Sequence, residues 1–156
     1  MSLRLEASRT VPVSVDEAFA GVLPVPLERI FGRRYAAIAG ITEVRDQEGD
    51  WGIPGQARTI VQSDGGQLHE TLIEVDEPNT FAYTITVTKG LNGFLIGGIV
   101  GRWSFEPAGT GTRITWTWEV TPTGRVAKLA MPVLARMWQG YARQGLEEIE
   151  KILVTG

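Results

Sequence analysis

The chain opens with a strict alternation of apolar and polar residues, namely Leu3, Arg4, Leu5, Glu6, Ala7 and Ser8. A period of two is typical of a β-strand, so we predict a first strand that runs on to about Val13. Strand-like composition returns after residue 40 in six segments, at residues 41–45, 56–62, 67–75, 80–88, 101–106 and 112–120. Most of the separators are short and rich in turn-forming residues. The pattern therefore predicts a seven-stranded antiparallel sheet of mostly sequential strands.

Two short helices are predicted after the first strand. Ser14 has the chemistry of a helix N-cap, and Glu17, three residues later, completes a capping box. Apolar residues then recur at helical spacing, which predicts a helix over residues 14–22. Prolines follow, and we place a second short helix at residues 27–31.

The last part of the chain changes from a period of two to helical spacing. Its apolar positions are Leu134, Met137, Trp138, Tyr141, Gly145, Ile149 and Ile152. This spacing predicts one amphipathic helix of about 20 residues, or about 30 Å. Pro132 should mark its first turn, or a kink if residues 126–130 are also helical. A twisted sheet curls, so the predicted fold is α+β, with the curved sheet wrapped around this helix and a cavity between them.

Composition narrows the classes of function. The 156 residues fit one domain, 1–156, with an apolar content of 43%. With no cysteine and one histidine, thiolate sites and multi-histidine sites are excluded, and we expect no metal and no cofactor. The net charge of −3 argues against a nucleic-acid partner. We see neither a signal peptide nor a membrane span, and expect a cytoplasmic protein.

Five segments carry a resemblance to a known family: Val13–Phe19, Glu70–Pro78, Phe81–Tyr83, Gly101–Phe105 and Gly111–Trp116. With the order of the elements, they resemble the START-like, helix-grip superfamily (SRPBCC), and within it the polyketide cyclase/dehydrase and lipid-transport group. The resemblance spans nearly the whole chain. It implies a deep, largely apolar pocket between the sheet and the C-terminal helix. It implies no shared set of catalytic residues, because the superfamily hosts carriers, cyclases and hydrolases.

Two sets of large side chains are candidates for the pocket walls. The sheet would supply Trp103, Phe105, Trp116 and Trp118, and the helix Met131, Leu134, Met137, Trp138 and Tyr141. Aromatic rings and flexible thioethers suit an apolar ligand. The alternative is that the same residues only fill the core.

One polar position in the strand at 67–75 is a candidate for chemistry. Glu70 shares a face with Leu68 and Leu72, and burial there would raise its pKa and suit it to proton transfer. His69 lies on the opposite face and would take that role if the faces were reversed.

Further polar candidates lie on the neighbouring strands. Tyr83 could offer its hydroxyl to a bound carbonyl. Arg58, Arg102 and Arg113 could hold a carboxylate or enolate, although a solvated surface position is the favoured interpretation for each arginine.

The segment Gly90–Gly101 is apolar and rich in glycine. We interpret it as a mobile flap near the pocket mouth; buried packing, a membrane-touching loop and a dimer contact are the alternatives.

Three hypotheses follow. The leading one is binding of a small hydrophobic molecule (lipid, aromatic or polyketide-like) in the cavity without catalysis. The second is a cyclase or dehydratase that uses Glu70 or His69 as base and Tyr83 or an arginine to stabilise an enolate. The third is a protein-interaction module that docks a partner through Gly90–Gly101, and a second copy of the chain in a homodimer is one such partner.

Overall fold

A computed structural model of the chain describes residues 2–155. The strands are β1 (Leu3–Val11), β2 (Ile41–Arg45), β3 (Ala57–Gln62), β4 (Gln67–Asp76), β5 (Thr80–Lys89), β6 (Ile96–Ala108) and β7 (Gly111–Pro122). The helices are α1 (Val15–Val22), α2 (Leu27–Ile30), the 3₁₀-helix η1 (Leu91–Phe94) and α3 (Arg125–Thr155). Every predicted strand is present, and most ends agree within one or two residues.

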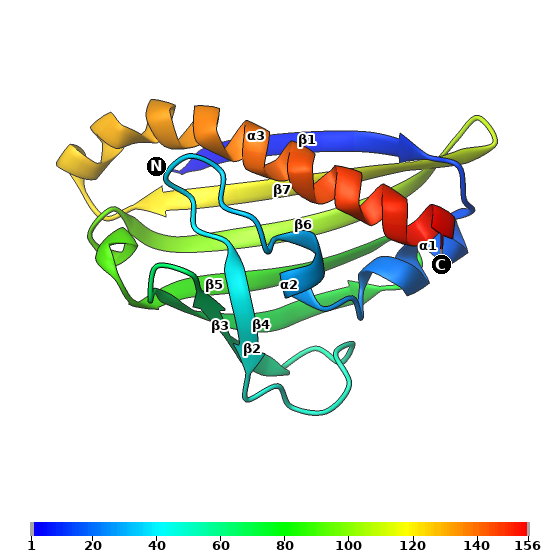
Figure 1. The fold of residues 1–156 in the computed structure, drawn as a ribbon, viewed down its shortest axis with the longest axis horizontal. Helices are drawn as coiled ribbons and strands as arrows, with labels where there is room; N and C mark the ends of the chain where they lie inside the picture. Colours follow the sequence, from blue (N-terminus) through cyan, green and yellow to red (C-terminus); the bar gives the residue numbers. More distant parts are fainter. Residues whose placement is uncertain (1, 156) are drawn as a thin grey trace.

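The seven strands form one antiparallel sheet in the order β1-β7-β6-β5-β4-β3-β2. Strands β2 to β7 follow one another as a meander. The first strand pairs with the last, so that Leu3 lies opposite Val120 and Val11 opposite Thr112. The chain must then cross from one edge of the sheet to the other, and α1 and α2 lie on that crossing (Figure 1). The predicted curved sheet with a long C-terminal helix is confirmed.

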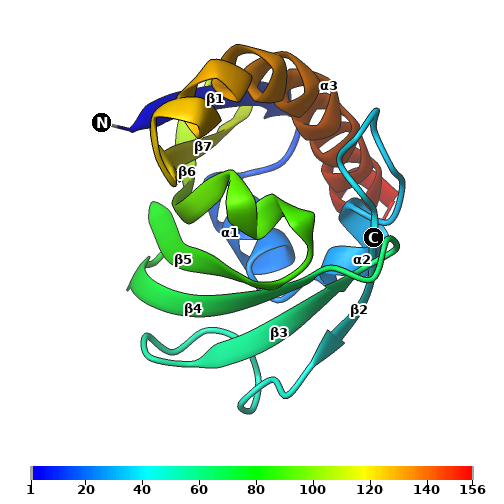
Figure 2. The same ribbon diagram turned by 90° about the vertical axis from the view of Figure 1, so that its left-hand side faces the viewer.

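Helix α3 runs along the open side of the curled sheet, next to β1 and β7 (Figures 1 and 2). Its length of 31 residues exceeds the predicted 20 because it begins at Arg125. Pro132 therefore lies inside the helix rather than in its first turn, the second of the two arrangements that the sequence allowed. A proline there removes one backbone N–H from the helical hydrogen-bond ladder.

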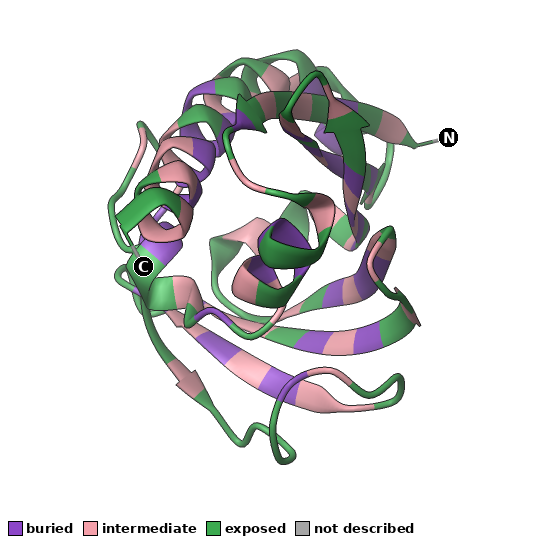
Figure 3. Ribbon diagram, turned by 90° about the vertical axis from the view of Figure 1, so that its right-hand side faces the viewer, coloured by how far each residue is buried: buried purple, intermediate pink, exposed green. Residues whose placement is uncertain are grey.

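Helix α1 begins as its capping box predicts. The hydroxyl oxygen of Ser14 accepts a hydrogen bond from the backbone N–H of Glu17 at 3.2 Å. Ala18, Phe19 and Val22 form its buried face. Helices α1 and α2 close the space between the sheet and α3 at the end where α3 terminates (Figure 3).

The sequence predicts one flap over Gly90–Gly101, whereas the structure divides this segment between η1 and the start of β6. Gly90 has a φ of 114°, a conformation that favours glycine, and it leads into η1. Strand β6 then begins at Ile96 rather than at Gly101. Extended pairing continues through the glycines because Gly98 and Ile99 lie opposite Thr121 and Val120 of β7. Only η1 and its flanking residues project from the sheet.

Candidate functional site

Two adjoining cavities lie between the sheet and α3. The inner cavity has a volume of about 80 Å³ and the outer one about 310 Å³. Ile38, Gln62, Leu68 and Trp118 line both of them. We therefore treat the pair as one site with a small inner and a larger outer chamber.

Aromatic rings form most of one wall of the inner cavity. Its ring-bearing lining residues are Phe31, Phe81, Tyr83, Trp103, Trp116, Trp118 and Tyr141. Trp116 stacks on Trp103 with ring centroids 5.0 Å apart. The ring centroid of Phe31 lies 4.9 Å from that of Trp116 and 5.1 Å from that of Tyr141. The rings of this wall thus pack against one another at the distances typical of aromatic pairs.

Tyr83 places a single hydroxyl group in this wall. Its oxygen accepts hydrogen bonds from Nε1 of Trp116 at 2.8 Å and from Nε1 of Trp118 at 3.1 Å. Burial raises the pKa of the Tyr83 phenol well above its ordinary value, and the charge of Glu70 raises it further, so the group stays protonated. Two indole donors occupy its oxygen, which leaves the O–H free to donate.

A buried ion pair forms the second polar group of the inner cavity. Nε of Arg58 donates to Oε1 of Glu70 at 2.6 Å, and each side chain is only 5% exposed. The two residues lie opposite each other on β3 and β4. Burial raises the pKa of the Glu70 carboxyl, because its desolvation outweighs the opposing charge and hydrogen bond of Arg58.

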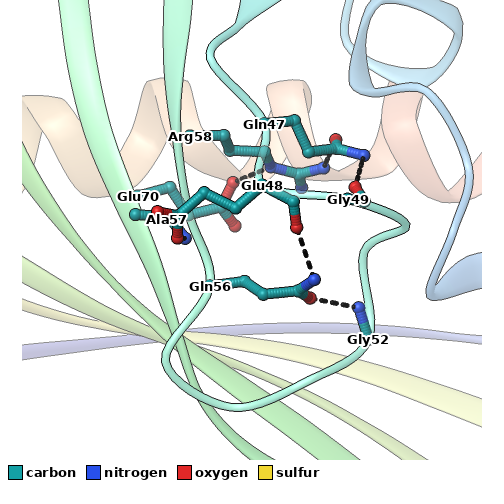
Figure 4. A network of polar contacts seen from close by, with 8 residues as sticks. All are labelled: Gln47, Glu48, Gly49, Gly52, Gln56, Ala57, Arg58 and Glu70. Carbon is teal, nitrogen blue, oxygen red and sulfur yellow. Dashed lines mark hydrogen bonds and ion pairs between the residues drawn. The ribbon is translucent and has the colours of Figure 1, made fainter.

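The loop between β2 and β3 covers this ion pair (Figure 4). Oε1 of Gln47 accepts from Nη1 of Arg58 at 3.1 Å, and the guanidinium carbon lies 3.8 Å from the ring centroid of Trp51. The side chain of Gln56 fastens the loop by accepting from the backbone N–H of Gly52 at 2.8 Å. The loop thus supplies Arg58 with a hydrogen bond and a cation–π contact in addition to Glu70.

The outer cavity has a different, mostly aliphatic lining. Helix α3 contributes Ala130, Met131, Val133, Leu134 and Met137. The opposite side comes from η1 and its surroundings, with Asn92, Leu95, Ile96 and Ile99. Methionine and leucine side chains can adjust to irregular apolar shapes.

The structure places most of the predicted wall residues at the cavities. Trp103, Trp116, Trp118 and Tyr141 line the inner one, and Met131, Leu134, Met137 and again Trp118 line the outer one. Phe105 and Trp138 were expected to join them but line neither cavity. Phe105 packs against Phe19 of α1, and Trp138 is fully buried between Trp116 and Trp118. Both belong to the core behind the wall.

The predicted polar residues lie on two different faces of the sheet. Glu70 points inward and is 4% exposed, whereas His69 is exposed on the outer face. Arg102 forms an ion pair with Glu74 on the outer surface, and Arg113 is exposed, as the sequence favoured. The expectation of a solvated Arg58 is wrong, because the loop around Trp51 covers it.

Sequence reasoning missed Gln47, Trp51 and Gln62. The alternation in β3 contained part of the signal, because Arg58, Ile60 and Gln62 share one face and all three are buried. Nothing local indicated that the β2–β3 loop would fold back over that face.

The arrangement offers hydrogen-bond donors and a carboxyl group in an apolar cavity. Within residues 2–155 no three His, Asp or Glu side chains gather as a metal site would require. Among those residues, no helix has both the length and the apolar composition needed to cross a bilayer.

The family follows from the sequence as a whole. The model of the family described as polyketide cyclase / dehydrase and lipid transport matches residues 2–154. The chain belongs to this family, and the expected SRPBCC-type resemblance is confirmed. A comparison with curated proteins found no match.

Solved structures show the same fold. The protein Ara h 8.0201 has a TM-score of 0.70 at 18% identity, with 100% of both chains covered. Ginseng major latex-like protein 151 from Panax ginseng has a TM-score of 0.69 at 18% identity over 97% of each chain. Protein MLL2253 from Mesorhizobium loti has a TM-score of 0.68 at 15% identity over 98% of each chain. The fold is therefore of the Bet v 1-like type.

Proposed function

We propose that this protein binds a small hydrophobic molecule in the two-chambered cavity between the sheet and α3. The observation that carries the proposal is the cavity itself, in which an apolar outer chamber of about 310 Å³ adjoins an inner chamber with a few buried polar groups. Ligand sites combine apolar walls with a small number of placed polar groups in this way. The family and the fold also favour ligand binding.

The polar groups suggest what the ligand carries at its inner end. The free hydrogen of Tyr83 is a donor, and a donor in an apolar wall is best satisfied by a carbonyl, ether or hydroxyl oxygen. The inner chamber of about 80 Å³ has room for only a small group. The ligand would therefore place an oxygen acceptor against Tyr83 and its apolar body in the outer chamber.

Matched probes test this arrangement. Binding of 1-acetonaphthone and of naphthalene, which lacks the carbonyl, can be followed by the quenching of tryptophan fluorescence. We expect tighter binding of the ketone, and loss of that preference in Tyr83→Phe. Equal binding of the two probes to the unaltered protein would contradict the role of Tyr83.

A second pair of variants tests the chamber. Leu134→Trp adds volume inside the outer cavity, whereas Leu129→Trp adds it at a position on the same helix that is 81% exposed. We expect only Leu134→Trp to weaken both probes. Failure of both probes to bind the unaltered protein, or undiminished binding to Leu134→Trp, would overturn the proposed site.

The raised pKa of Glu70 favours a second candidate function, proton transfer in the same cavity. The Glu70 carboxylate would remove a proton from the carbon beside a carbonyl whose oxygen accepts from Tyr83, and then return it. Bound 1-acetonaphthone in D₂O would exchange its methyl hydrogens for deuterium, detected by NMR. Exchange at the rate of buffer alone, or equally fast exchange with Glu70→Gln, would contradict proton transfer by Glu70. Ligand binding would then remain the proposed function.

A further inference from the structure

Two elements that line the outer cavity, η1 and α3, also expose large apolar side chains. Leu91 and Phe94 of η1 are 82% and 76% exposed, and Val126 and Leu129 of α3 are 80% and 81% exposed. Water-exposed residues of this size on two neighbouring elements are unusual for a surface that faces only solvent. We call these four residues the apolar rim.

The two elements that carry the apolar rim lie side by side. The backbone N–H of Thr123, just before α3, donates to the carbonyl of Leu95 at 3.1 Å, and the Thr123 hydroxyl donates to the carbonyl of Phe94 at 2.5 Å. Both elements line the outer cavity. Figure 2 shows η1 and the first turns of α3 at the same end of the grip.

The two segments that carry the apolar rim contain charges of one sign only. Residues 86–100 and 121–139, which contain the apolar rim, include Lys89, Arg125, Lys128 and Arg136 and no acidic residue. The whole chain has a net charge of −3. All four basic side chains are exposed, and none forms an ion pair within the part of the chain that the structure describes.

The start of α3 carries both exposed apolar and exposed basic side chains on one helix. Val126, Leu129 and Val133 follow each other at helical spacing and are exposed, while Ala127, Met131 and Leu134 face the interior. Arg125, Lys128 and Arg136 occupy the neighbouring exposed stripe. An outward apolar stripe beside a basic one is typical of helices that lie in the interface of a membrane.

We propose that this end docks on an anionic lipid bilayer, with the apolar rim among the acyl chains and the four basic side chains at the headgroups. This proposal goes beyond ligand binding in the cavity. Charge complementarity favours a lipid surface, since anionic headgroups present many negative charges to two segments that carry four exposed basic side chains without ion-pair partners among the described residues. The outer cavity would then lie next to the membrane, because η1 and α3 line it, and an apolar molecule would have a short path between bilayer and cavity.

Vesicle flotation tests the docking. We expect the protein to float with phosphatidylcholine vesicles that contain 30% phosphatidylglycerol and to remain unbound with pure phosphatidylcholine. Raising the salt concentration should release it, because exposed charges are screened. No flotation with the anionic vesicles, or equal flotation with both kinds, would overturn the proposal.

Two double variants assign the surface. Leu91→Asp/Phe94→Asp and Arg125→Glu/Lys128→Glu should each lower the partition coefficient at least about tenfold. Ile53→Asp is the matched control, since Ile53 is an apolar residue 66% exposed in the β2–β3 loop. Circular dichroism confirms that each variant is folded. Full flotation of both double variants would overturn the proposal that this surface binds the bilayer. Light scattering that shows two copies of the chain paired through the apolar rim would also overturn it, because the rim would then be a dimer interface.

The outcome is separable from that of the proposed function. None of the four altered residues lines either cavity. The variants should therefore bind 1-acetonaphthone normally in the absence of vesicles. Ketone binding without flotation overturns the docking alone, whereas flotation without ketone binding overturns the cavity's role alone.

Discussion

The ring of Tyr83 on β5 lies over the backbone of Gly101, its direct partner on β6. A Cβ atom at position 101 would overlap the Tyr83 ring and hydroxyl oxygen. Gly101 in turn lies opposite Trp118 on β7. The absence of a side chain at Gly101 thus lets the tyrosine reach across β6 to the two indoles that bind its oxygen. The donor in the cavity wall depends on this one glycine.

Gly101→Ala should destabilise the protein by about 1–3 kcal/mol, the usual cost of overfilling a packed core. The methyl group would displace the Tyr83 ring and weaken the preference for the ketone probe. Urea unfolding measures the first effect and fluorescence quenching the second. Gly98→Ala is the control on the same strand, because a Cβ atom there meets only a carbonyl oxygen at 3.9 Å. Equal stability of the two variants would contradict the packing described.

Tyr83→Phe removes the acceptor of two indole N–H groups. Trp116 is 3% exposed, and its N–H would be left without its partner. We expect a loss of about 1–3 kcal/mol in the free energy of unfolding, the cost of an unsatisfied buried donor. Urea unfolding gives the value. A variant as stable as the unaltered protein would mean that water enters the cavity and replaces the phenol oxygen.

Arg58→Met should cost about 3 kcal/mol or more at neutral pH, because it leaves the buried Glu70 without its cation. Adding Glu70→Leu should recover most of that loss. Arg102→Met is the matched control, since its partner Glu74 lies on the exposed face, and it should cost less than about 1 kcal/mol. Strictly additive losses in the Arg58 and Glu70 double-mutant cycle would show that the two groups are not coupled.

The raised pKa of Glu70 gives stability a pH dependence with a defined sign. The folded protein holds this proton more tightly than the unfolded chain, whose carboxyl titrates near 4.5. As the pH rises above that value the unfolded state loses the proton first, so the stability contributed by Glu70 falls. We expect the unfolding free energy of the unaltered protein, taken relative to Glu70→Gln, to decrease from pH 4.5 upward. An increase would mean that Arg58 outweighs burial and lowers the pKa.

The strand at Gln67–Asp76 illustrates how far sequence reasoning reached. Alternation correctly placed Glu70 and His69 on opposite faces. It did not decide which face was inward, because each face carried apolar residues. In the structure Ile73 on the His69 face is 46% exposed, while Leu72 beside Glu70 is fully buried. Only the direction of curvature, set by the whole sheet, separates the two.

Arg58 illustrates a different limit. Its alternation with Ile60 was visible, yet a charged residue is expected at the surface. Its burial depends on Glu70 across the strand pair and on Trp51 in the folded-back loop. Neither contact is local in sequence.

The sequence by itself determined the strands, the capped first helix, the amphipathic last helix and therefore the helix-grip fold, because alternation and helical spacing decide locally which face of each element is apolar. The tertiary structure decided where the apolar faces meet tightly and where they leave space. It placed Phe105 and Trp138 in the core, left Met137 at a cavity and buried Arg58 beneath a loop. The physical reason is that a cavity forms where segments distant in sequence do not fill the space between them, whereas the apolar face of a helix or strand follows from the residues of that element alone.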